Sequence, residues 1–373
     1  MKAIKAHSAA ITGITACEGK LISGGKDKRI AIITAEGGNF KLEKFIDFSS
    51  SFPKALDFFK GNLLVGLRNG SIAEFKNVLT TESPVENVVM KSHFEGEIWG
   101  LELVPDQNKV ITCADDNQIM VFDYESKSFD RKGTVSGHKS ADKEKLKKAT
   151  SSSMSAYPEN QQARALAFSA KHGHLVVCSN LGKVSIRDFA DLDKKIASLK
   201  DAQEWCEVAR YSPDEKFLAT ASHDNNLYVY SVGDDGSYSL YKAFSKHNSF
   251  ITAFDWSADG TYIRTQCGAY EKLYFNIPDK TQDAAGLSNT KDLQWATISV
   301  KLGWDVQGVH PSGEDGTHIN GVEVNADRSL LVSTDDWGLM NVYNYPVCDS
   351  THEPRSYSGH SEHVVRAKFT PDS

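Results

Sequence analysis

The sequence of 373 residues has little of what marks a membrane, secreted or nucleic-acid-binding protein. No stretch approaches the roughly 20 consecutive apolar residues that span a bilayer. Over residues 1–30, His7, Lys20, Lys26 and Asp27 interrupt every apolar run, so no secretory signal peptide is expected. The formal net charge of −7 argues against the basic surface that general nucleic-acid binding requires. We therefore predict a cytoplasmic protein that binds neither membranes nor nucleic acid.

Cysteine pairs at metal-ligand spacing are also missing. The six cysteines are scattered and form no Cys-x-x-Cys pair: Cys17, Cys113, Cys178, Cys206, Cys267 and Cys348. This distribution is typical of reduced thiols buried in strands, and not of a disulfide framework or a zinc site. Near the C-terminus, Cys348 is followed by His352, His360 and His363, but this spacing does not match the paired ligands of a structural zinc site. We predict no cofactor and no metal.

What the sequence does contain is a repeated phrase, in which small residues are followed by Asp or Asn, a turn and an alternating apolar strand. The phrase occurs as SGGKDKRIAII at 23–33, CADDNQIMVFD at 113–123, ASHDNNLYVY at 221–230 and STDDWGLMNVY at 333–343. Weaker copies begin at Val65, Cys178 and Cys267. The first apolar residues after the turns are at positions 30, 72, 119, 184, 227, 273 and 339. Most of these steps are close to the ~40–45-residue period of a four-stranded propeller blade.

The fold class that follows is all-β. Turn sequences such as SPD at 212–214 and SADG at 257–260 separate the strands, as β-hairpins require. No long segment has helical periodicity. A propeller is one way in which many short antiparallel strands protect their edges. We predict a WD-repeat β-propeller with seven recognisable repeats plus a partial eighth.

The partial eighth repeat is VVRAKFTPD at 364–372, which resembles a first strand. One strand without partners would leave unpaired backbone groups. We therefore expect the chain to be incomplete by itself, as a fragment or as part of an assembly. The alternative is that the seven full repeats close into one ring and the last strand frays.

Histidines open several repeats, and Ser or Thr and Asp follow within the same repeat: the histidines are His7, His93, His138, His247 and His360. Such sets resemble Ser-His-Asp triads, but a nucleophile would be unique, whereas these sets recur with the blade. We interpret them as buried hydrogen-bond networks that join the loops of each blade. The predicted network residues are His7, Asp27, His93, Asp116, Asp224 and Asp336, and we predict that the protein is not an enzyme.

Two steps of the repeat are longer than the others, and the first contains a basic segment at 126–162 with eight basic residues against four acidic ones. This segment is either a solvated insertion or a basic arm for an acidic partner such as the tails of tubulin. The predicted partner-binding residues are Arg131, Lys132, Lys139, Lys143, Lys145, Lys147 and Lys148. The second long step contains Trp295 and Trp304 among turn residues, which predicts an irregular but packed blade.

Several phrases resemble the echinoderm microtubule-associated protein-like family, whose members have a tandem propeller. They are HFEGEIWGL at 93–101, RYSPD at 210–214, ASHDNNLYVY at 221–230, SFITAFDW at 249–256, LQWAT at 293–297 and, most specifically, GVHPSGEDGTHIN at 308–320. The resemblance covers nearly the whole chain. It implies that residues 1–92 are the last two blades of an upstream propeller, and that 93–373 are a second propeller lacking the end of its final blade. The alternative is one seven-bladed ring over 1–373.

What the resemblance implies about function is a scaffold that associates with tubulin or microtubules and with other cytoskeletal or axonemal proteins. A structural component of ciliary axonemal microtubules is the narrower form of this expectation. Two positions depart from the family pattern, because His310 and His318 stand where the family usually has Trp and Asp. The alternative function is a general protein-interaction adaptor in another multiprotein complex, since a propeller fold does not fix function.

Overall fold

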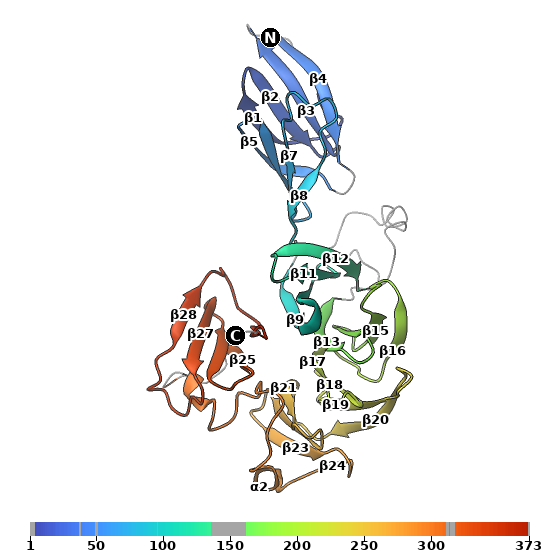
Figure 1. The fold of residues 1–373 in the computed structure, drawn as a ribbon, viewed down its shortest axis with the longest axis vertical. Coiled ribbons are helices and arrows are strands. Elements are labelled where there is room, and N and C mark those ends of the chain that lie inside the picture. The colour runs from blue at the N-terminus through green and yellow to red at the C-terminus, as the bar shows by residue number, and fades with distance from the viewer. Residues whose placement is uncertain are drawn as a thin grey trace. The chain divides into compact units, whose positions relative to one another are not determined.

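The computed structural model describes residues 4–36, 39–48, 51–94, 96–135, 162–310, 313 and 318–371. Over these ranges the chain forms seven four-stranded antiparallel sheets. The predicted all-β propeller class is therefore confirmed. The chain divides into two compact units, Met1–Glu95 with two sheets and Gly96–Ser373 with five (Figure 1). Among the described residues, no helix has the length and apolar character needed to cross a membrane.

The first unit contains two sheets of four consecutive strands. The first sheet consists of β1 (Ile11–Cys17), β2 (Lys20–Gly25), β3 (Arg29–Glu36) and β4 (Asn39–Asp47). The second consists of β5 (Pro53–Phe59), β6 (Asn62–Leu67), β7 (Ile72–Phe75) and β8 (Asn87–Met90). Apolar residues of the two sheets share one core, which includes Ile22, Ile30, Leu63, Val65 and Phe75.

The second unit contains five sheets of the same topology. The third sheet consists of β9 (Ile98–Val104), β10 (Lys109–Ala114), β11 (Gln118–Asp123) and β12 (Ser128–Thr134); the fourth of β13 (Ala163–Ser169), β14 (His174–Ser179), β15 (Val184–Asp188) and β16 (Lys195–Leu199). The fifth consists of β17 (Cys206–Tyr211), β18 (Phe217–Ser222), β19 (Asn226–Val232) and β20 (Tyr238–Ser245); the sixth of β21 (Ile251–Trp256), β22 (Tyr262–Cys267), β23 (Lys272–Asn276) and β24 (Thr281–Gln282). The seventh consists of β25 (Ile319–Val324), β26 (Leu330–Asp335), β27 (Leu339–Asn344) and β28 (Arg355–Ser358), and the short helices are η1 (Pro105–Gln107), α2 (Gly286–Asn289) and η3 (Gln307–Val309).

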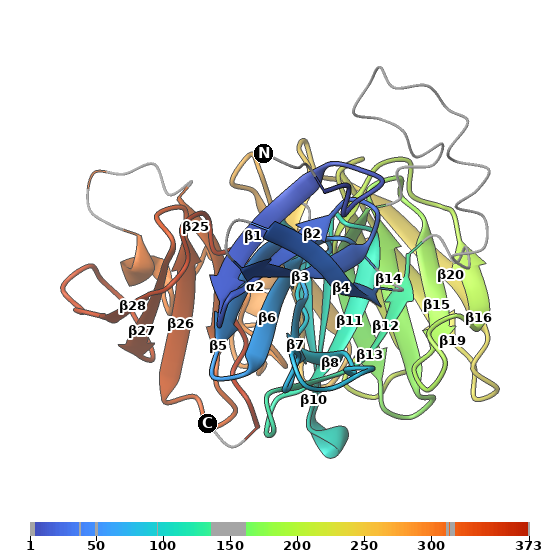
Figure 2. The same cartoon turned by 90° about the horizontal axis from the view of Figure 1, so that it is seen from above.

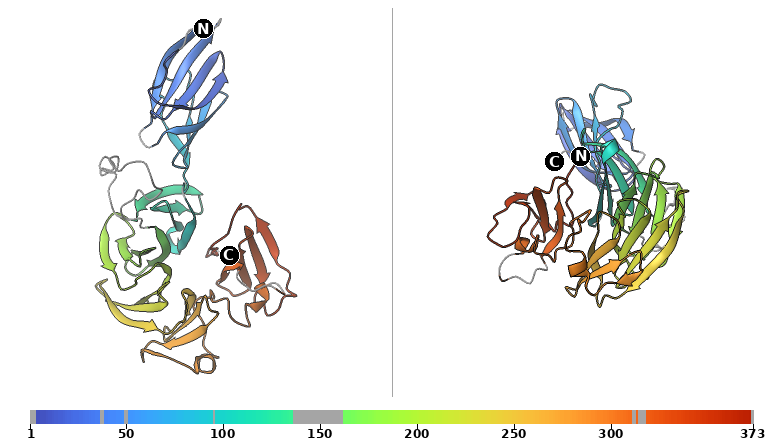
Figure 3. Two further views of the ribbon diagram at one scale, coloured as in Figure 1. Left: turned by 180° about the vertical axis from the view of Figure 1, so that it is seen from behind. Right: turned by 60° about the horizontal axis from the view of Figure 1, so that its bottom comes forward.

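The sheets of the second unit follow one another around a common axis in chain order, as Figure 1 and Figure 3 show from opposite sides. Successive first strands β9, β13, β17 and β21 contact one another. The fourth strands lie outside, and Figure 2 shows β16 and β20 at the edge of their sheets. This arrangement explains the sequence pattern, because β14 is buried along its whole length and reads HLVVCS, whereas β16 is mostly exposed and reads KIASL.

The described residues 277–310 of the second long step are packed in part: Trp295 is buried, as predicted, whereas Trp304 is 68% exposed. Trp295 lies on the side chain of Arg264, with 4.5 Å between the guanidinium carbon and the ring centroid. It shares a core with Tyr274, Val306 and Tyr343, which belong to the sixth and seventh sheets and to the loop between them. The loop therefore joins these two sheets through buried aromatic and aliphatic side chains.

One set of backbone hydrogen bonds recurs in all seven sheets, between the turn after the second strand and the residue that precedes the first strand. The donors are the amides of Lys26, Arg68, Asp115, Asn180, His223, Gly268 and Asp336, and the acceptors are the carbonyls of Ala10, Phe52, Glu97, Gln162, Trp205, Phe250 and His318. Each bond closes the same end of its sheet, where the chain enters the first strand.

Side chains of the same turns add a second bond, which we call the turn network. In five sheets a carboxylate or amide oxygen accepts the backbone N–H that leads into the first strand: Ser8 to Asp27 (2.9 Å), Glu97 to Asp115 (3.1 Å), Gln162 to Asn180 (3.0 Å), Gln203 to Asp224 (2.8 Å) and Asn248 to Glu271 (2.9 Å). Four of these bonds are exposed and the bond to Gln162 is part-buried, so each contributes about 0.5–1.5 kcal/mol to holding its loop in place.

The predicted network residues occupy different places in this pattern. In the first sheet, His7 lies between Asp27 (Nδ1 to Oδ1, 3.0 Å) and Ser23 (Nε2 to Oγ, 2.9 Å), which is the expected His–Ser–Asp set. Asp224 accepts from Gln203 N–H, Asn226 N–H and Tyr228 Oη–H, so its contacts here are with its own turn and the preceding loop.

In the remaining sheets the structure differs from the prediction in detail. Asp116 accepts the N–H of Gln118, whereas its neighbour Asp115 makes the bond to the preceding loop. Asp336 lies 2.6 Å from Nδ1 of His363, because the segment that follows β28 brings residue 363 to the turn. His93 is half-buried in the first unit.

Residues 364–371, expected as the first strand of an eighth blade, form no strand. They are held by individual bonds to three sheets instead. The amide of Val364 donates to Asp335 O (2.9 Å), Arg366 donates to Glu207 O (2.5 Å), and Lys368 forms an ion pair with Glu102 (2.5 Å). The segment thus contacts the seventh, fifth and third sheets.

The turn network predicts the effect of Asp27→Ala. This change removes the acceptor of the Ser8 N–H and the partner of His7, and we expect it to lower the free energy of unfolding by roughly 1–3 kcal/mol in denaturant titration. Burial raises the pKa of Asp27, but the hydrogen bonds from Ser8 and His7 lower it, and the pKa lies below its usual value. The stabilisation is therefore present above about pH 4 and is lost as pH falls further, so the difference between the two proteins shrinks in acid.

The exposed residue Asp57 supplies the matched control, because Asp57→Ala removes the same charge from the same unit. We expect it to change stability by less than about 0.5 kcal/mol at every pH. Equal effects of the two changes would contradict the role given to Asp27.

Candidate protein-binding face

The end of each sheet that carries the turn network also carries a run of aromatic side chains in the second unit. Because antiparallel strands alternate in direction, the loop before the first strand and the turn after the second strand lie at the same end. Trp99 and Trp205 come from such loops or from the start of a first strand, and His223 comes from a turn. These positions bring side chains from different sheets together on one face.

We call Trp99, Arg164, Trp205, His223 and Phe250 the aromatic stack. The guanidinium carbon of Arg164 lies 4.4 Å from the ring centroid of Trp99 and 4.6 Å from that of Trp205. Trp205 and His223 have ring centroids 4.3 Å apart, and His223 and Phe250 are stacked at 4.6 Å. The stack therefore runs without a break across the third, fourth, fifth and sixth sheets.

Arg164 is the centre of the stack and is itself held by the turn network. Its Nη1 donates to Asp115 Oδ1 at 2.7 Å, and its Nη2 donates to Gln162 Oε1 at 2.8 Å. The indole N–H of Trp99 donates to the same Asp115 oxygen at 3.1 Å. The Arg164 side chain is only 8% exposed, so the cation is held between two indole faces and is paired with Asp115, while its Nε has no hydrogen-bond partner.

Below the stack, charged groups surround a cavity of about 70 Å³ near the axis of the unit. Its lining includes Glu207, Arg210, Glu323 and Arg366. His223 Nε2 lies 3.1 Å from Glu207 Oε2. Burial raises the pKa of Glu207, but the hydrogen bond to His223 and the charge of Arg366 lower it, and the pKa lies below its usual value. Burial raises the pKa of Glu323.

This arrangement suits the binding of another protein. Trp and Arg dominate the energetics of protein interfaces, where rigid aromatic anchors lose little conformational entropy on binding. Phe250 at one end of the stack is 40% exposed, and Trp337 in the seventh sheet is 54% exposed beside His318, with 4.6 Å between the ring centroids. An incoming chain would meet fixed, partly exposed rings around a charged axis.

The predicted basic arm is only partly within the described residues. Arg131 and Lys132 belong to strand β12 and do not lie in a projecting loop. Arg131 donates to Asp130 and to Phe189 O at 2.6 and 2.7 Å, so its guanidinium joins the third and fourth sheets. Lys132 donates to Gln118 at 3.2 Å. The other predicted partner-binding residues lie outside the described residues: Lys139, Lys143, Lys145, Lys147 and Lys148.

Sequence reasoning did not identify the aromatic stack. Its members are separated by up to about 150 positions and share no motif, so only the order of the sheets brings them together. The available signal was a tryptophan near the start of the first strand in two repeats, at IWG 98–100 and EWC 204–206. Trp99 and Trp205 in equivalent places indicate neighbours on the same face.

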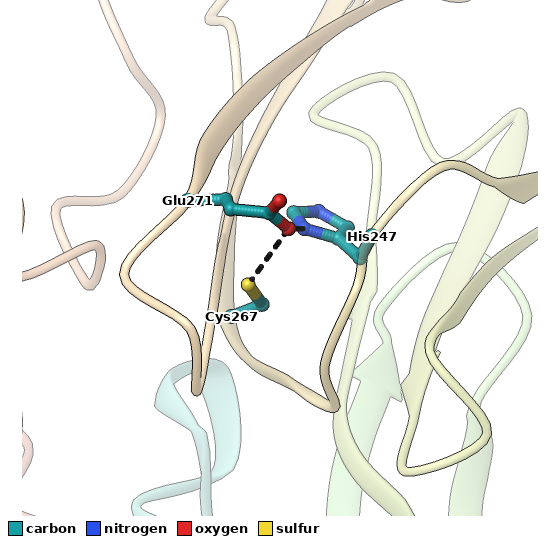
Figure 4. Close-up of side chains that lie close together, drawn as sticks. All are labelled: His247, Cys267 and Glu271. Carbon is teal, nitrogen blue, oxygen red and sulfur yellow. Dashed lines mark hydrogen bonds and ion pairs between the residues drawn. The ribbon is translucent and has the colours of Figure 1, made fainter.

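Among the described residues, one group of potential metal ligands converges: His247, Cys267 and Glu271 (Figure 4). The cluster considered near the C-terminus does not converge, since His352 lies 3.3 Å from Asp349 and His363 lies 2.6 Å from Asp336. Of the two positions that depart from the family pattern, His318 contacts Asp336 at 3.5 Å, and His310 Nε2 lies 3.4 Å from Lys301 O.

A model of the second β-propeller of echinoderm microtubule-associated protein matches residues 98–373. This chain belongs to the echinoderm microtubule-associated protein-like family. The matched range contains the whole aromatic stack and all five sheets of the second unit. The family resemblance of the sequence motifs is thereby confirmed.

Individual relatives in the family show how much of a protein the chain represents. A ciliary WD repeat-containing protein ctxp80 from Euplotoides octocarinatus is 42% identical over 95% of this chain and 47% of its own length. The 77 kDa echinoderm microtubule-associated protein of Strongylocentrotus purpuratus is 32% identical over 95% of this chain and 48% of its own. Echinoderm microtubule-associated protein-like 2 of Mus musculus is 29% identical over 98% and 52%. The chain spans about half the length of these relatives.

The aromatic stack predicts the effect of Arg164→Met, which removes the cation between Trp99 and Trp205 and leaves the half-buried carboxylate of Asp115 without its ion-pair partner. We expect the free energy of unfolding to fall by about 1.5–3 kcal/mol, as for the loss of hydrogen bonds to a charged group. Tryptophan emission should shift as the two indoles become wetter. Arg355→Met, at an exposed position of β28, is the control and should leave both readouts unchanged. An Arg164→Met protein with parental stability would show that the stack is not held by Arg164.

Proposed function

We propose that this chain is a non-catalytic WD-repeat scaffold that associates with tubulin or microtubules. The observation that supports it is the aromatic stack, a rigid and partly exposed set of interface-type side chains within the range that matches the family's second propeller. Relatives that the chain matches are named as microtubule-associated or ciliary proteins. In this proposal the sheets act as a frame and their loops as the binding surface.

In this proposal, two features of the second unit contribute to binding in different ways. The partly exposed rings of the stack supply short-range apolar contact with the partner, which sets how long a complex lasts. The basic segment at 126–162 supplies a local positive charge on an acidic protein, which attracts acidic surfaces such as the tails of tubulin and accelerates encounter. Both features lie within the residue range of the second unit.

A ciliary location is the narrower part of the proposal. The relative with 42% identity is named as a ciliary protein, which supports a structural role on axonemal microtubules. We also propose that the two sheets of residues 1–95 belong to an upstream propeller and that the five sheets of 96–373 belong to the second one. The boundary between the compact units supports this division.

The first test of the proposal is co-sedimentation with microtubules across a salt titration. Changing Lys143, Lys145, Lys147 and Lys148 to Ala should weaken binding and flatten its salt dependence, because fewer charges contribute to the attraction. The matched control changes four exposed lysines elsewhere, Lys54, Lys60, Lys76 and Lys242, and so alters net charge equally. Equal loss in both variants would mean that net charge alone matters, and parental binding by the first would make the segment an insertion.

The second test concerns the stack itself. Phe250→Ala removes an exposed ring while leaving the turn network intact, and we expect binding to microtubules or soluble tubulin to fall by about tenfold at all salt concentrations. Leu287→Ala, which removes a 71% exposed side chain elsewhere in the same unit, is the control. Unchanged binding by Phe250→Ala would assign the contact to another surface.

A further inference from the structure

The sixth sheet repeats the hydrogen-bond network of the first sheet but replaces one of its residues. In the first sheet Gly25 ends the second strand and pairs with Ile11, next to a bulge. In the sixth sheet Cys267 occupies the same register position and pairs with Ile251. The register also matches Ser23 with Thr265, since each pairs three positions further along the first strand. The two sheets can therefore be compared residue by residue.

The side chain at this register position points at the network. A Cβ placed on Gly25 would lie 2.5 Å from His7 Nδ1 and 2.5 Å from Asp27 Oδ1. The first sheet therefore needs glycine there, because His7 and Asp27 are in direct contact. The sixth sheet instead places a sulfur at the equivalent position, beside His247 and Glu271 (Figure 4).

The distances in the sixth sheet differ accordingly. Glu271 Oε2 lies 3.5 Å from His247 Nδ1 and 3.2 Å from Cys267 Sγ, and the three ligand atoms all lie within 4.8 Å of one another. A tetrahedral zinc ion with bonds of about 2.0–2.3 Å separates its ligand atoms by roughly 3.3–3.6 Å. The separations of Glu271 from His247 and from Cys267 are close to this spacing, and His247 Nδ1 and Cys267 Sγ lie within 4.8 Å of each other.

The imidazole is also oriented for this role. His247 is 7% exposed, and its Nε2 lies 2.6 Å from Thr265 Oγ1. That hydroxyl donates to Leu273 O, so it can accept a hydrogen bond from Nε2–H. Nδ1 then carries the lone pair, and in this structure it has no hydrogen-bond partner. In the first sheet, by contrast, His7 Nδ1 is bonded to Asp27 at 3.0 Å.

We propose that His247 Nδ1, Cys267 Sγ and Glu271 Oε2 form a zinc site between the loop before β21 and the turn after β22. A thiolate with an imidazole favours Zn²⁺ over Mg²⁺ or Ca²⁺, which take oxygen ligands. Binding displaces the thiol proton of Cys267 to solvent, and a water molecule completes the fourth position. Thr265 is the positioning residue that fixes the imidazole.

A bound ion would hold the loop that carries Phe250. Asn248 donates from its backbone to Glu271, and the amide of Gly268 in the adjoining turn donates to Phe250 O at 2.9 Å. Because His247 precedes β21 whereas Cys267 and Glu271 belong to the end of β22 and the turn after it, metal coordination would cross-link two segments that are now joined by hydrogen bonds. The inference does not depend on the proposed binding of tubulin.

The experiment uses the reduced, tag-free, metal-stripped full chain titrated with Co²⁺ and Zn²⁺. We expect one Co²⁺ per chain with a sulfur-to-cobalt absorption band, displacement by Zn²⁺, and a higher melting temperature with zinc. Cys267→Ser should lose the band and bind zinc more than about 100-fold more weakly, beyond the range of second-shell changes. Cys348→Ser, at a half-exposed free cysteine, should behave as the parent.

Serine is compatible with the fold at this register position, because Ser179 and Ser222 occupy it in the fourth and fifth sheets. Cys267→Gly, which copies the first sheet, is a second variant with the same expected loss. Circular dichroism and metal-free melting should show that both variants are folded. A parent that takes up no Co²⁺ with a thiolate band, or a Cys267 variant that retains zinc affinity, would overturn the proposal.

Discussion

In five of the seven described sheets, a hydrogen bond joins a backbone N–H ahead of the first strand to a side-chain oxygen in the turn after the second strand, and the loop that enters the sheet depends on it. It joins residues 18 to 23 positions apart, such as Glu97 with Asp115 and Asn248 with Glu271. A short antiparallel sheet has weak ends, since its loops are exposed and its terminal backbone groups need partners. By tying the start of the sheet to its middle, this bond makes four strands into one unit.

The same bond determines what the loops can present. Once a loop is fixed at its backbone, the aromatic residues beside it have few orientations left, and rings from neighbouring sheets can stack. Asp115 illustrates the coupling, because one carboxylate accepts from the Glu97 amide, the Trp99 indole and the Arg164 guanidinium. A surface organised in this way binds with less loss of side-chain entropy than one built from free loops.

The repeat was readable from sequence because each blade needs the same turn before a buried third strand. All seven predicted positions, from Ile30 to Leu339, lie at or one residue after the start of a third strand. The choice between Asp115 and Asp116 was not readable, since strand alternation and the bulge before it decide which carboxylate faces the loop. The aromatic stack could not be predicted from the sequence for another reason, because Trp99, Arg164 and Trp205 are brought together only by the order of the sheets in space.

The sixth sheet has the same backbone pattern as the other sheets of this chain but carries different side chains in it. Glu271 lies six residues after Thr265, whereas Asp27 lies four residues after Ser23, so a search for one spacing passes over the acid of the sixth sheet. Register restores the equivalence, and it places Gly25, Ala114, Ser222, Cys267 and Asp335 at one position. In the seventh sheet Asp335 uses this position to accept the amides of its own turn. The backbone therefore fixes where a side chain points, and the residue type alone decides whether that position closes a turn, packs against a histidine or offers a ligand.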